Sequence, residues 1–229
     1  IFNTQKTYTN YISKIKKGVN KMKVLIACEY SGIVRDAFTA KGHDVTSCDI
    51  LPTESKGKHY QGDVLDILED GWDLMIAHPP CQYLTNAGVR WFNEERYGDK
   101  AKERKKLRLE AFDFFMKLIN APIDKIAVEN PVGWVNGHYR KPNQIIHPYY
   151  FGDPENKRTC LWLKNLPNLD PTNMVEPKIY AYFKSGAKKG KPIYWCDYQG
   201  RRKDAERWKI RSTTFQGIAD AMANQWGSK

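Results

Sequence analysis

Short apolar runs alternate with segments that carry apolar residues at helical spacing along most of the chain. Such runs predict buried strands at 23–28, 44–48, 74–77 and 126–128. The helical spacing predicts helices at 33–40, 64–68 and 100–120. Strands separated by helices predict an α/β fold with a doubly wound, mostly parallel sheet.

Polar residues follow directly after these predicted strands and turns. They are Glu29, Asp49, Asp63, His78 and Glu129. In open α/β sheets, ligands bind beyond the carboxyl ends of the strands. The sequence therefore places its candidate chemistry at one edge of the sheet.

The composition indicates a packed α/β domain with a small appendage. The 229 residues are 41% hydrophobic and 28% charged, which excludes wholesale disorder. No apolar run reaches the roughly 18 residues that a membrane-spanning helix needs. The five cysteines form no CxxC pair, so we expect neither a disulfide framework nor a metal site, and a reducing, cytoplasmic setting.

The net charge of +11 is concentrated in two segments. Residues 1–23 carry six lysines and no acid, and residues 184–211 carry ten basic residues against three acids. Such clustering favours a polyanion partner, although solvated lysine-rich loops remain an alternative. The basic extension 1–21 either forms a short helix over 9–17 that contacts the body or a polyanion, or is foreign to the domain.

Two loops carry the candidate chemistry. In the first, two prolines precede Cys81, whose thiol needs a lowered pKa to act as a nucleophile. In the second, Glu129 lies in an apolar frame, so we expect a raised pKa that lets it share a proton with a ring nitrogen. The alternatives are a buried small hydrophobe for Cys81 and a helix cap or ion-pair partner for Glu129.

Four motifs together resemble the DNA (cytosine-5) methyltransferase family, in particular its small phage and prophage members in restriction-modification contexts. They are PPCQ at 79–82 with TNAG at 85–88, VENP at 128–131, ENKRTCLWL at 155–163 and RSTTFQGIADAMA at 211–223. The resemblance covers Met22 to Trp226. It implies a Rossmann-like fold and transfer of a methyl group from S-adenosyl-L-methionine to carbon-5 of cytosine in double-stranded DNA.

The resemblance also implies roles for individual residues. Cys81 attacks carbon-6 of a flipped cytosine, and Glu129 holds the Watson–Crick edge of the ring. Arg158, or else Lys157, donates to the cytosine carbonyl oxygen, since alternation along a strand turns only one of them into the pocket. The implied catalytic set is Cys81, Glu129, Arg158, Pro80 and Asn130.

The implied cofactor site lies on the same sheet. Asp49 would bind ribose hydroxyls, and Asp63 would contact the adenine amino group or simply cap the following helix. The implied set is Cys28, Glu29, Tyr30, Ser31, Gly32, Asp49, Ile50, Asp63, Val64, His78, Pro79, Ser212 and Thr213.

Two departures from the family pattern affect this site. The glycine-rich motif retains only Gly32, so either the backbone approaches the cofactor less closely or Glu29 contacts the cofactor amine. His78 stands where the family usually has glycine.

The segment 167–209 occupies the place of the family's target-recognition domain, between catalytic segments 22–166 and 210–229. It mixes basic and aromatic residues, which suits phosphate contact and base stacking, although a small subdomain with solvated lysines is the alternative. Its size suggests a site of about two to four base pairs. The implied substrate contacts are Gln82, Thr85, Asn86, Lys157, Lys188, Lys189, Lys191, Arg201 and Arg202.

Three functions remain open at this point. The chain is a monomeric DNA cytosine-5 methyltransferase, an enzyme with the same chemistry on free deoxycytidylate, or a non-catalytic nucleic-acid-binding relative. The basic cluster argues against the second function. The presence of both Cys81 and Glu129 argues against the third.

Overall fold

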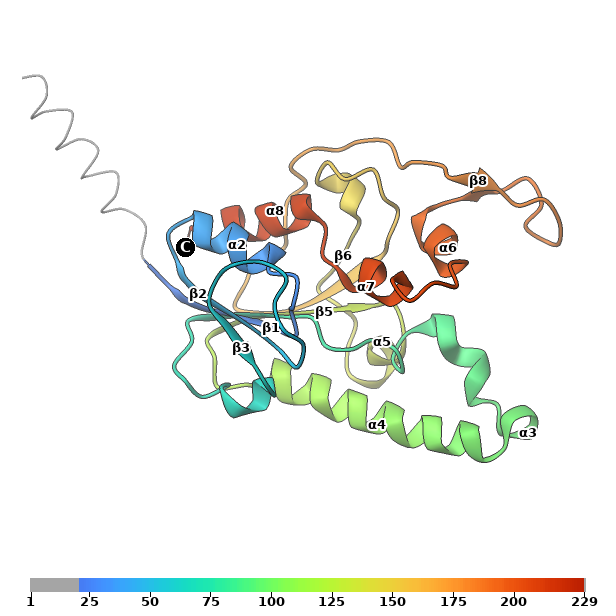
Figure 1. Ribbon diagram of the computed structural model, residues 1–229, viewed down its shortest axis with the longest axis horizontal. Helices are drawn as coiled ribbons and strands as arrows, with labels where there is room; N and C mark the ends of the chain where they lie inside the picture. The colour runs from blue at the N-terminus through green and yellow to red at the C-terminus, as the bar shows by residue number, and fades with distance from the viewer. Residues whose placement is uncertain (1–20, 229) are drawn as a thin grey trace, which may run out of the picture.

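A seven-stranded mixed sheet forms the centre of the computed structural model, which describes residues 21–228 (Figure 1). In spatial order its strands are β3 (His59–Gln61), β2 (Asp44–Asp49), β1 (Lys23–Ala27), β4 (Leu74–Ala77), β5 (Lys125–Pro131), β7 (Thr159–Lys164) and β6 (Gln144–Ile146). The first five strands are parallel, and β7 pairs antiparallel with both β5 and β6. The prediction of a mostly parallel α/β sheet is confirmed.

Helices lie on both faces of this sheet and beyond its carboxyl edge. The helices of the described residues are α2 (Ile33–Ala40), α3 (Glu94–Tyr97), α4 (Asp99–Ile119), α5 (Trp134–His138), α6 (Trp195–Gly200), α7 (Arg207–Ser212) and α8 (Gln216–Trp226). Helices α2 and α8 lie together on one face, and α4 runs along the other (Figure 1). Short 3-10 helices are η1 (Val64–Asp66), η2 (Asn86–Phe92) and η3 (Pro148–Tyr150).

Alternation along the strands supplies both halves of the core. In β1, Val24 and Ile26 pack toward α2 and α8, whereas Leu25 and Ala27 pack toward α4. All four side chains are fully buried. This two-sided burial explains why the strands read as continuous apolar runs rather than as alternating patterns.

Strand β5 extends further than its sequence predicts. We expected it to end at Val128, but Glu129, Asn130 and Pro131 continue the strand and pair with β7. The proline is tolerated because it is the last residue of the strand. The Glu129 carboxylate therefore projects from a strand and not from a loop.

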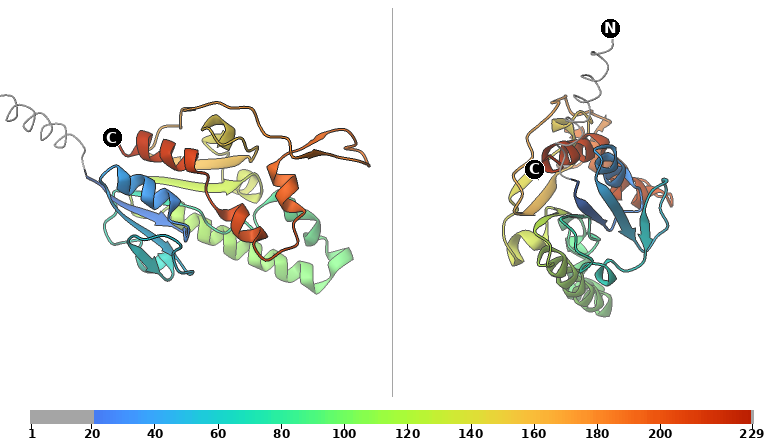
Figure 2. Two further views of the ribbon diagram at one scale, coloured as in Figure 1. Left: turned by 45° about the horizontal axis from the view of Figure 1, so that its top comes forward. Right: turned by 90° about the vertical axis from the view of Figure 1, so that its left-hand side faces the viewer.

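The segment 167–209 divides into two parts. Its first residues lie against the core: Leu169 is buried, and Trp226 donates a hydrogen bond to the Pro167 carbonyl oxygen at 3.0 Å. Further along, β8 (Ala181–Tyr182) and β9 (Pro192–Ile193) form a small hairpin that projects away from the sheet (Figure 2). Helices α6 and α7 follow and lead back to α8.

Two further expectations concerned an N-terminal helix and a membrane-spanning helix. The helix expected over 9–17 lies outside the described residues. Within residues 21–228, no helix is both long and apolar enough to cross a membrane.

Candidate functional site

A large cleft opens at the carboxyl ends of β1, β2, β4 and β5. Its volume is about 1840 Å³, and it is bounded on its outer side by α4 and α7. Cys28, Asp49 and Asp63 line one end, and Cys81 and Glu129 line the middle. All the predicted site residues line it except Gly32, Asn86, Asn130, Lys188, Lys189, Lys191, Arg201 and Arg202.

The loop after β4 presents Cys81 to this cleft. A tight turn follows the cysteine, because the backbone N–H groups of Leu84 and Thr85 both donate to the Cys81 carbonyl oxygen at 3.0 Å. Thr85 then caps η2 through a hydrogen bond from the Ala87 N–H at 3.3 Å. The residue Cys81 is exposed at the cleft surface, and the cleft walls surround its thiol.

Backbone contacts join the Cys81 loop to the end of β5. The Asn130 side-chain amide donates to the Pro79 carbonyl oxygen at 3.1 Å, so Asn130 acts behind the cleft lining. The Trp134 N–H donates to the Leu84 carbonyl oxygen at 2.7 Å. Gly133, directly before Trp134, lies so close to Leu84 that a Cβ atom at Gly133 would overlap the Leu84 carbonyl group. Cys81 and Glu129 are thus held in one rigid unit.

Two arginines of α4 also hold the Cys81 loop, and sequence reasoning missed both. Arg104 donates to the Gln82 carbonyl oxygen and Arg108 to that of Tyr83, each at 3.2 Å. The Arg108 guanidinium lies over the rings of Phe92 and Trp134. The signal in the sequence was their spacing. Arg104 and Arg108 are four residues apart, so they share one face of the helix, and this face is the apolar one.

Lys157 and Arg158 both line the cleft, contrary to the expectation that only one would. The expectation assumed a strand, but β7 begins only at Thr159, so alternation does not apply to these residues. Lys157 donates to the Arg211 carbonyl oxygen at 3.3 Å and lies 5.8 Å from the Phe215 ring centroid. Its charge acts on both Glu129 and Cys81, whereas that of Arg158 acts on His147, Cys160 and Cys196.

The pKa of Glu129 is lowered, not raised as expected. Burial alone raises the pKa of this carboxyl, but the His78 imidazole and the charge of Lys157 lower it by more. The His78 Nδ1 lies 3.7 Å from the Glu129 Oε2. The expectation was based only on the apolar residues next to Glu129 in the sequence, which do not reveal that His78 and Lys157 act on it in the fold.

The pKa of Cys81 is raised rather than lowered. Desolvation by the cleft walls raises it most, and the charge of Glu129 adds to this effect. The positive charges of Lys157 and Arg211 lower the pKa of Cys81 and so oppose both effects. The resting group in the unliganded protein is therefore the thiol, and additional positive charge in the cleft favours the thiolate.

Glu29 is a helix cap and not a free carboxylate. It is 4% exposed, and its two oxygens accept hydrogen bonds from the N–H groups of Val34 at 2.7 Å and Arg35 at 3.2 Å. Burial raises the pKa of Glu29 despite these bonds. Both oxygens serve the N-terminus of α2, and the contact of Glu29 with a cofactor amine stays a prediction. Gly32 begins that helix with a φ of 79°.

The end of the cleft next to β1 and β2 combines carboxylates with apolar surface. Asp49 ends β2 and accepts a hydrogen bond from the Leu51 N–H at 2.9 Å, while burial raises the pKa of Asp49. Asp63 caps η1 through the Leu65 N–H at 3.0 Å, so the expected alternative of a cap is realised. Ile50 lines the same end and is 76% exposed.

The turn after β1 contacts α7 across this end. The Tyr30 hydroxyl lies 3.2 Å from the Ser212 Oγ, and its ring centroid lies 5.7 Å from that of Trp208. Lys209 forms an ion pair with Glu54. Ser212 and Thr213 thereby reach the cleft, as predicted, from a helix and the residue after it rather than from a loop.

The basic residues of 184–211 that we singled out lie outside the cleft. Lys188 and Arg201 both contact the Phe183 ring, at 5.2 and 5.0 Å, and Arg202 pairs with Asp204 at 2.9 Å. The three lysines lie in the loop between β8 and β9 of the projecting hairpin, and Arg201 and Arg202 directly follow α6.

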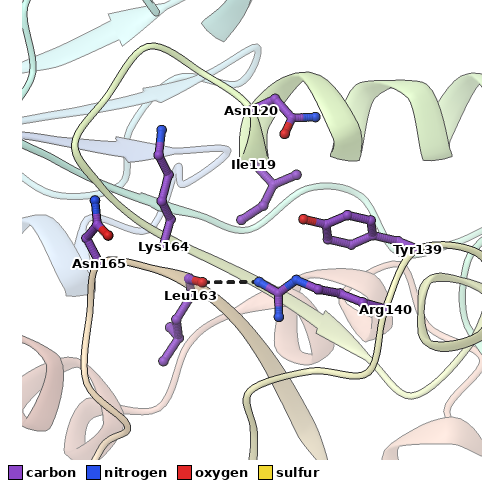
Figure 3. A pocket seen from close by; sticks show the side chains of 7 residues that line it. All are labelled: Ile119, Asn120, Tyr139, Arg140, Leu163, Lys164 and Asn165. Atoms are coloured by element: carbon purple, nitrogen blue, oxygen red, sulfur yellow. Dashed lines mark hydrogen bonds between the residues drawn. The ribbon is translucent and has the colours of Figure 1, made fainter.

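A second hollow of about 400 Å³ lies between the end of α4 and β7 (Figure 3). Its two cations are engaged with backbone: Arg140 donates to the Leu163 carbonyl oxygen, and Lys164 to those of Ala121 and Ile123. Among the described residues, no group of three or more His, Cys, Asp or Glu side chains is arranged to hold a metal ion.

Comparison with known proteins adds no family to this geometry. The chain matches no protein-family model, and no curated protein matches it.

The close approach at Gly133 predicts a local effect of Gly133→Ala. The added methyl group overlaps the Leu84 carbonyl group, so the Cys81 loop must move, and we expect a lower melting temperature and altered alkylation of Cys81. Gly137→Ala is the matched control, because no atom lies within 4 Å of its Cβ position. Equal behaviour of the two variants in thermal unfolding and alkylation would contradict the rigid unit.

The charge balance predicts that Glu129→Gln lowers the pKa of Cys81. Removing the carboxylate removes the negative charge that raises the pKa of Cys81, while Lys157 and Arg211 still lower it, so the thiolate forms at lower pH. The measurement is the rate of iodoacetamide modification against pH, with Cys81→Ser identifying the signal. An unchanged pH profile would show that Glu129 does not act on the thiol.

Proposed function

We propose that this chain transfers a methyl group from S-adenosyl-L-methionine to carbon-5 of cytosine in DNA through a covalent adduct on Cys81. One observation carries the proposal. A single cleft is lined by a thiol, a carboxylate and the cation that acts on both, namely Cys81, Glu129 and Lys157. Nucleophile and proton-sharing groups in reach of one ligand suit addition to an electron-poor ring.

The residues at the other end of the cleft fit the cofactor. Asp49 ends the second strand, where a carboxylate accepts from ribose hydroxyls in nucleotide-binding sheets. The exposed side chain of Ile50 offers apolar surface to an adenine ring. Cys28 has a φ of 58°, so the turn after β1 takes a glycine-like conformation despite its few glycines. S-adenosyl-L-methionine supplies an electrophilic methyl group and a positive sulfonium charge when bound.

The chain's own residues divide the reaction into steps. The Cys81 thiolate forms a bond to carbon-6, and Glu129 passes a proton to the ring nitrogen, which makes carbon-5 nucleophilic. After carbon-5 has gained the methyl group it loses its proton, the sulfur–carbon bond breaks, and the thiolate is restored. Lys157, or Arg158 beside it, donates to the carbonyl oxygen of the ring.

The size of the cleft supports a large substrate. Small-molecule pockets are commonly about 300–1,000 Å³, and this cleft exceeds that range. Its outer part is lined by residues of α6 and α7, and the segment 184–211, which contains α6 and α7 up to Arg211, carries ten basic residues against three acids. A flipped base requires such phosphate contacts, because unstacking costs a few kcal/mol.

Methyl transfer itself is the first test. With radiolabelled S-adenosyl-L-methionine, we expect label in duplex DNA and none in deoxycytidylate. Cys81→Ala should abolish labelling while still binding the cofactor in calorimetry, because the thiolate activates the ring and does not hold the cofactor. Label in deoxycytidylate instead would favour the nucleotide enzyme, and DNA binding without any label a non-catalytic role.

Salt dependence tests the DNA partner separately. If the hairpin contacts phosphates, the logarithm of DNA affinity should fall with the logarithm of salt at about −0.9 per phosphate neutralised. Replacing Lys188, Lys189 and Lys191 by alanine should flatten that slope and weaken the binding of all DNA sequences by the same factor. Replacing Lys41, Lys56 and Lys58 removes the same charge outside the cleft as a control. Equal effects of the two triple variants would reject a specific role for the hairpin.

A further inference from the structure

His78 lies between two carboxylates at the base of the cleft. Its side chain is 9% exposed, and its Nδ1 is 3.7 Å from the Glu129 Oε2. Glu29, itself 4% exposed, is near enough that a charge on His78 lowers the pKa of Glu29.

The other nitrogen of His78 is buried and has no hydrogen-bond partner among the described residues. An unpartnered buried polar atom is costly unless something compensates, so purely structural packing does not explain a histidine here. Histidine is also the side chain whose ordinary protonation range lies nearest neutral pH. The imidazole is therefore placed to hold a proton beside the carboxylate that needs one.

We propose that His78 is a positioning residue that stores the proton Glu129 passes to the ring nitrogen of the base. The proposal rests on the proposed function, because it assigns the source of a proton in that reaction. Glu129 is ionised in the unliganded site and has no proton of its own to give. His78 supplies it without contacting the substrate.

The proton inventory of this relay closes over one turnover. The Cys81 thiol first loses its proton to solvent. As the bond from the Cys81 sulfur to carbon-6 then forms, one proton moves from the His78 Nδ1 to the Glu129 carboxylate and on to the ring nitrogen. When that bond breaks, this proton returns by the same route, and the released thiolate regains a proton from solvent. The carbon-5 proton leaves separately to solvent, so His78 is neither consumed nor left altered.

Other charged or titratable groups face this pair from neighbouring elements. Lys157 acts on Glu129 from the segment before β7, and Cys81 lies on the same loop as His78. Cys160 of β7 also senses the Glu129 charge, and Arg211 acts on Cys81. Lysine and arginine normally keep their protons at neutral pH, and both cysteines have raised pKa values, so His78 is the group suited to exchange a proton there.

The first experiment needs no catalysis. In the unliganded protein, the ¹³C resonance of the Glu129 carboxyl, assigned by its loss in Glu129→Gln, is titrated with pH. We expect His78→Asn to raise the pKa of Glu129, because asparagine carries no charge. His138→Asn, the same change on an exposed histidine outside the cleft, should leave it unchanged. No shift in His78→Asn would overturn the pairing.

The second experiment is the pH profile of methyl transfer. Without His78, Glu129 must carry the proton itself, and its protonated fraction grows as pH falls. We expect His78→Asn to lose about 100-fold in rate at pH 8, within the usual range for acid–base groups, and less at pH 6. A deficit equal at every pH would indicate a structural role and overturn the relay.

The two experiments separate the relay from the function beneath it. Suppose that His78→Asn shifts the Glu129 titration but the unmodified protein transfers no methyl group. This result would establish the ion pair between His78 and Glu129, and it would reject both the proposed function and the relay as a step of that reaction. Normal transfer by His78→Asn across the pH range would overturn the relay and leave the proposed function intact.

Discussion

The antiparallel pairing of β7 with β5 is the constraint on which the rest of the site depends. It places Thr159 opposite Pro131 and Leu161 opposite Glu129, so the chain entering β7 arrives at the carboxyl end of a parallel strand. Lys157 is brought beside Glu129 and Cys81 in this way. The parallel register of β4 with β5 aligns Ala77 with Val128 and so starts the Cys81 loop next to Glu129.

A thiol and a carboxylate close together oppose each other's ionisation, and the surrounding residues manage this conflict. His78 and Lys157 hold the carboxylate charged, while the carboxylate in turn keeps the thiol protonated. The loop itself is fixed by backbone bonds and by Arg104 and Arg108 rather than by the reactive groups. Such an arrangement keeps Cys81 in its thiol form, and under the proposed function a ligand that adds positive charge to the cleft would favour the thiolate.

Local sequence signals were sufficient for the central parallel strands and the two helices α2 and α4, but not for short elements such as β3 and β6 or for the partners of each element. The strands at β1, β2 and β4 and the helices α2 and α4 follow from apolar periodicity, and the residues after the strands do line one cleft. The antiparallel β7, the extension of β5 through Pro131 and the pKa of Glu129 depend on contacts between distant segments, which periodicity does not encode. Glu29 shows the same limit. Its side chain can cap α2 only because of the path that the turn between Glu29 and the helix takes, and the sequence pattern does not show this path.

Covalent chemistry at Cys81 is the central proposal, and trapping is its most direct test. A duplex containing 5-fluorocytosine is incubated with the protein and S-adenosyl-L-methionine, and the intact mass is measured after denaturation. Fluorine at carbon-5 cannot leave as a proton does, so the sulfur–carbon bond persists. We predict an adduct of the protein with the DNA that maps to the peptide containing Cys81. Absence of the adduct, or an adduct on another cysteine, would contradict the proposed chemistry.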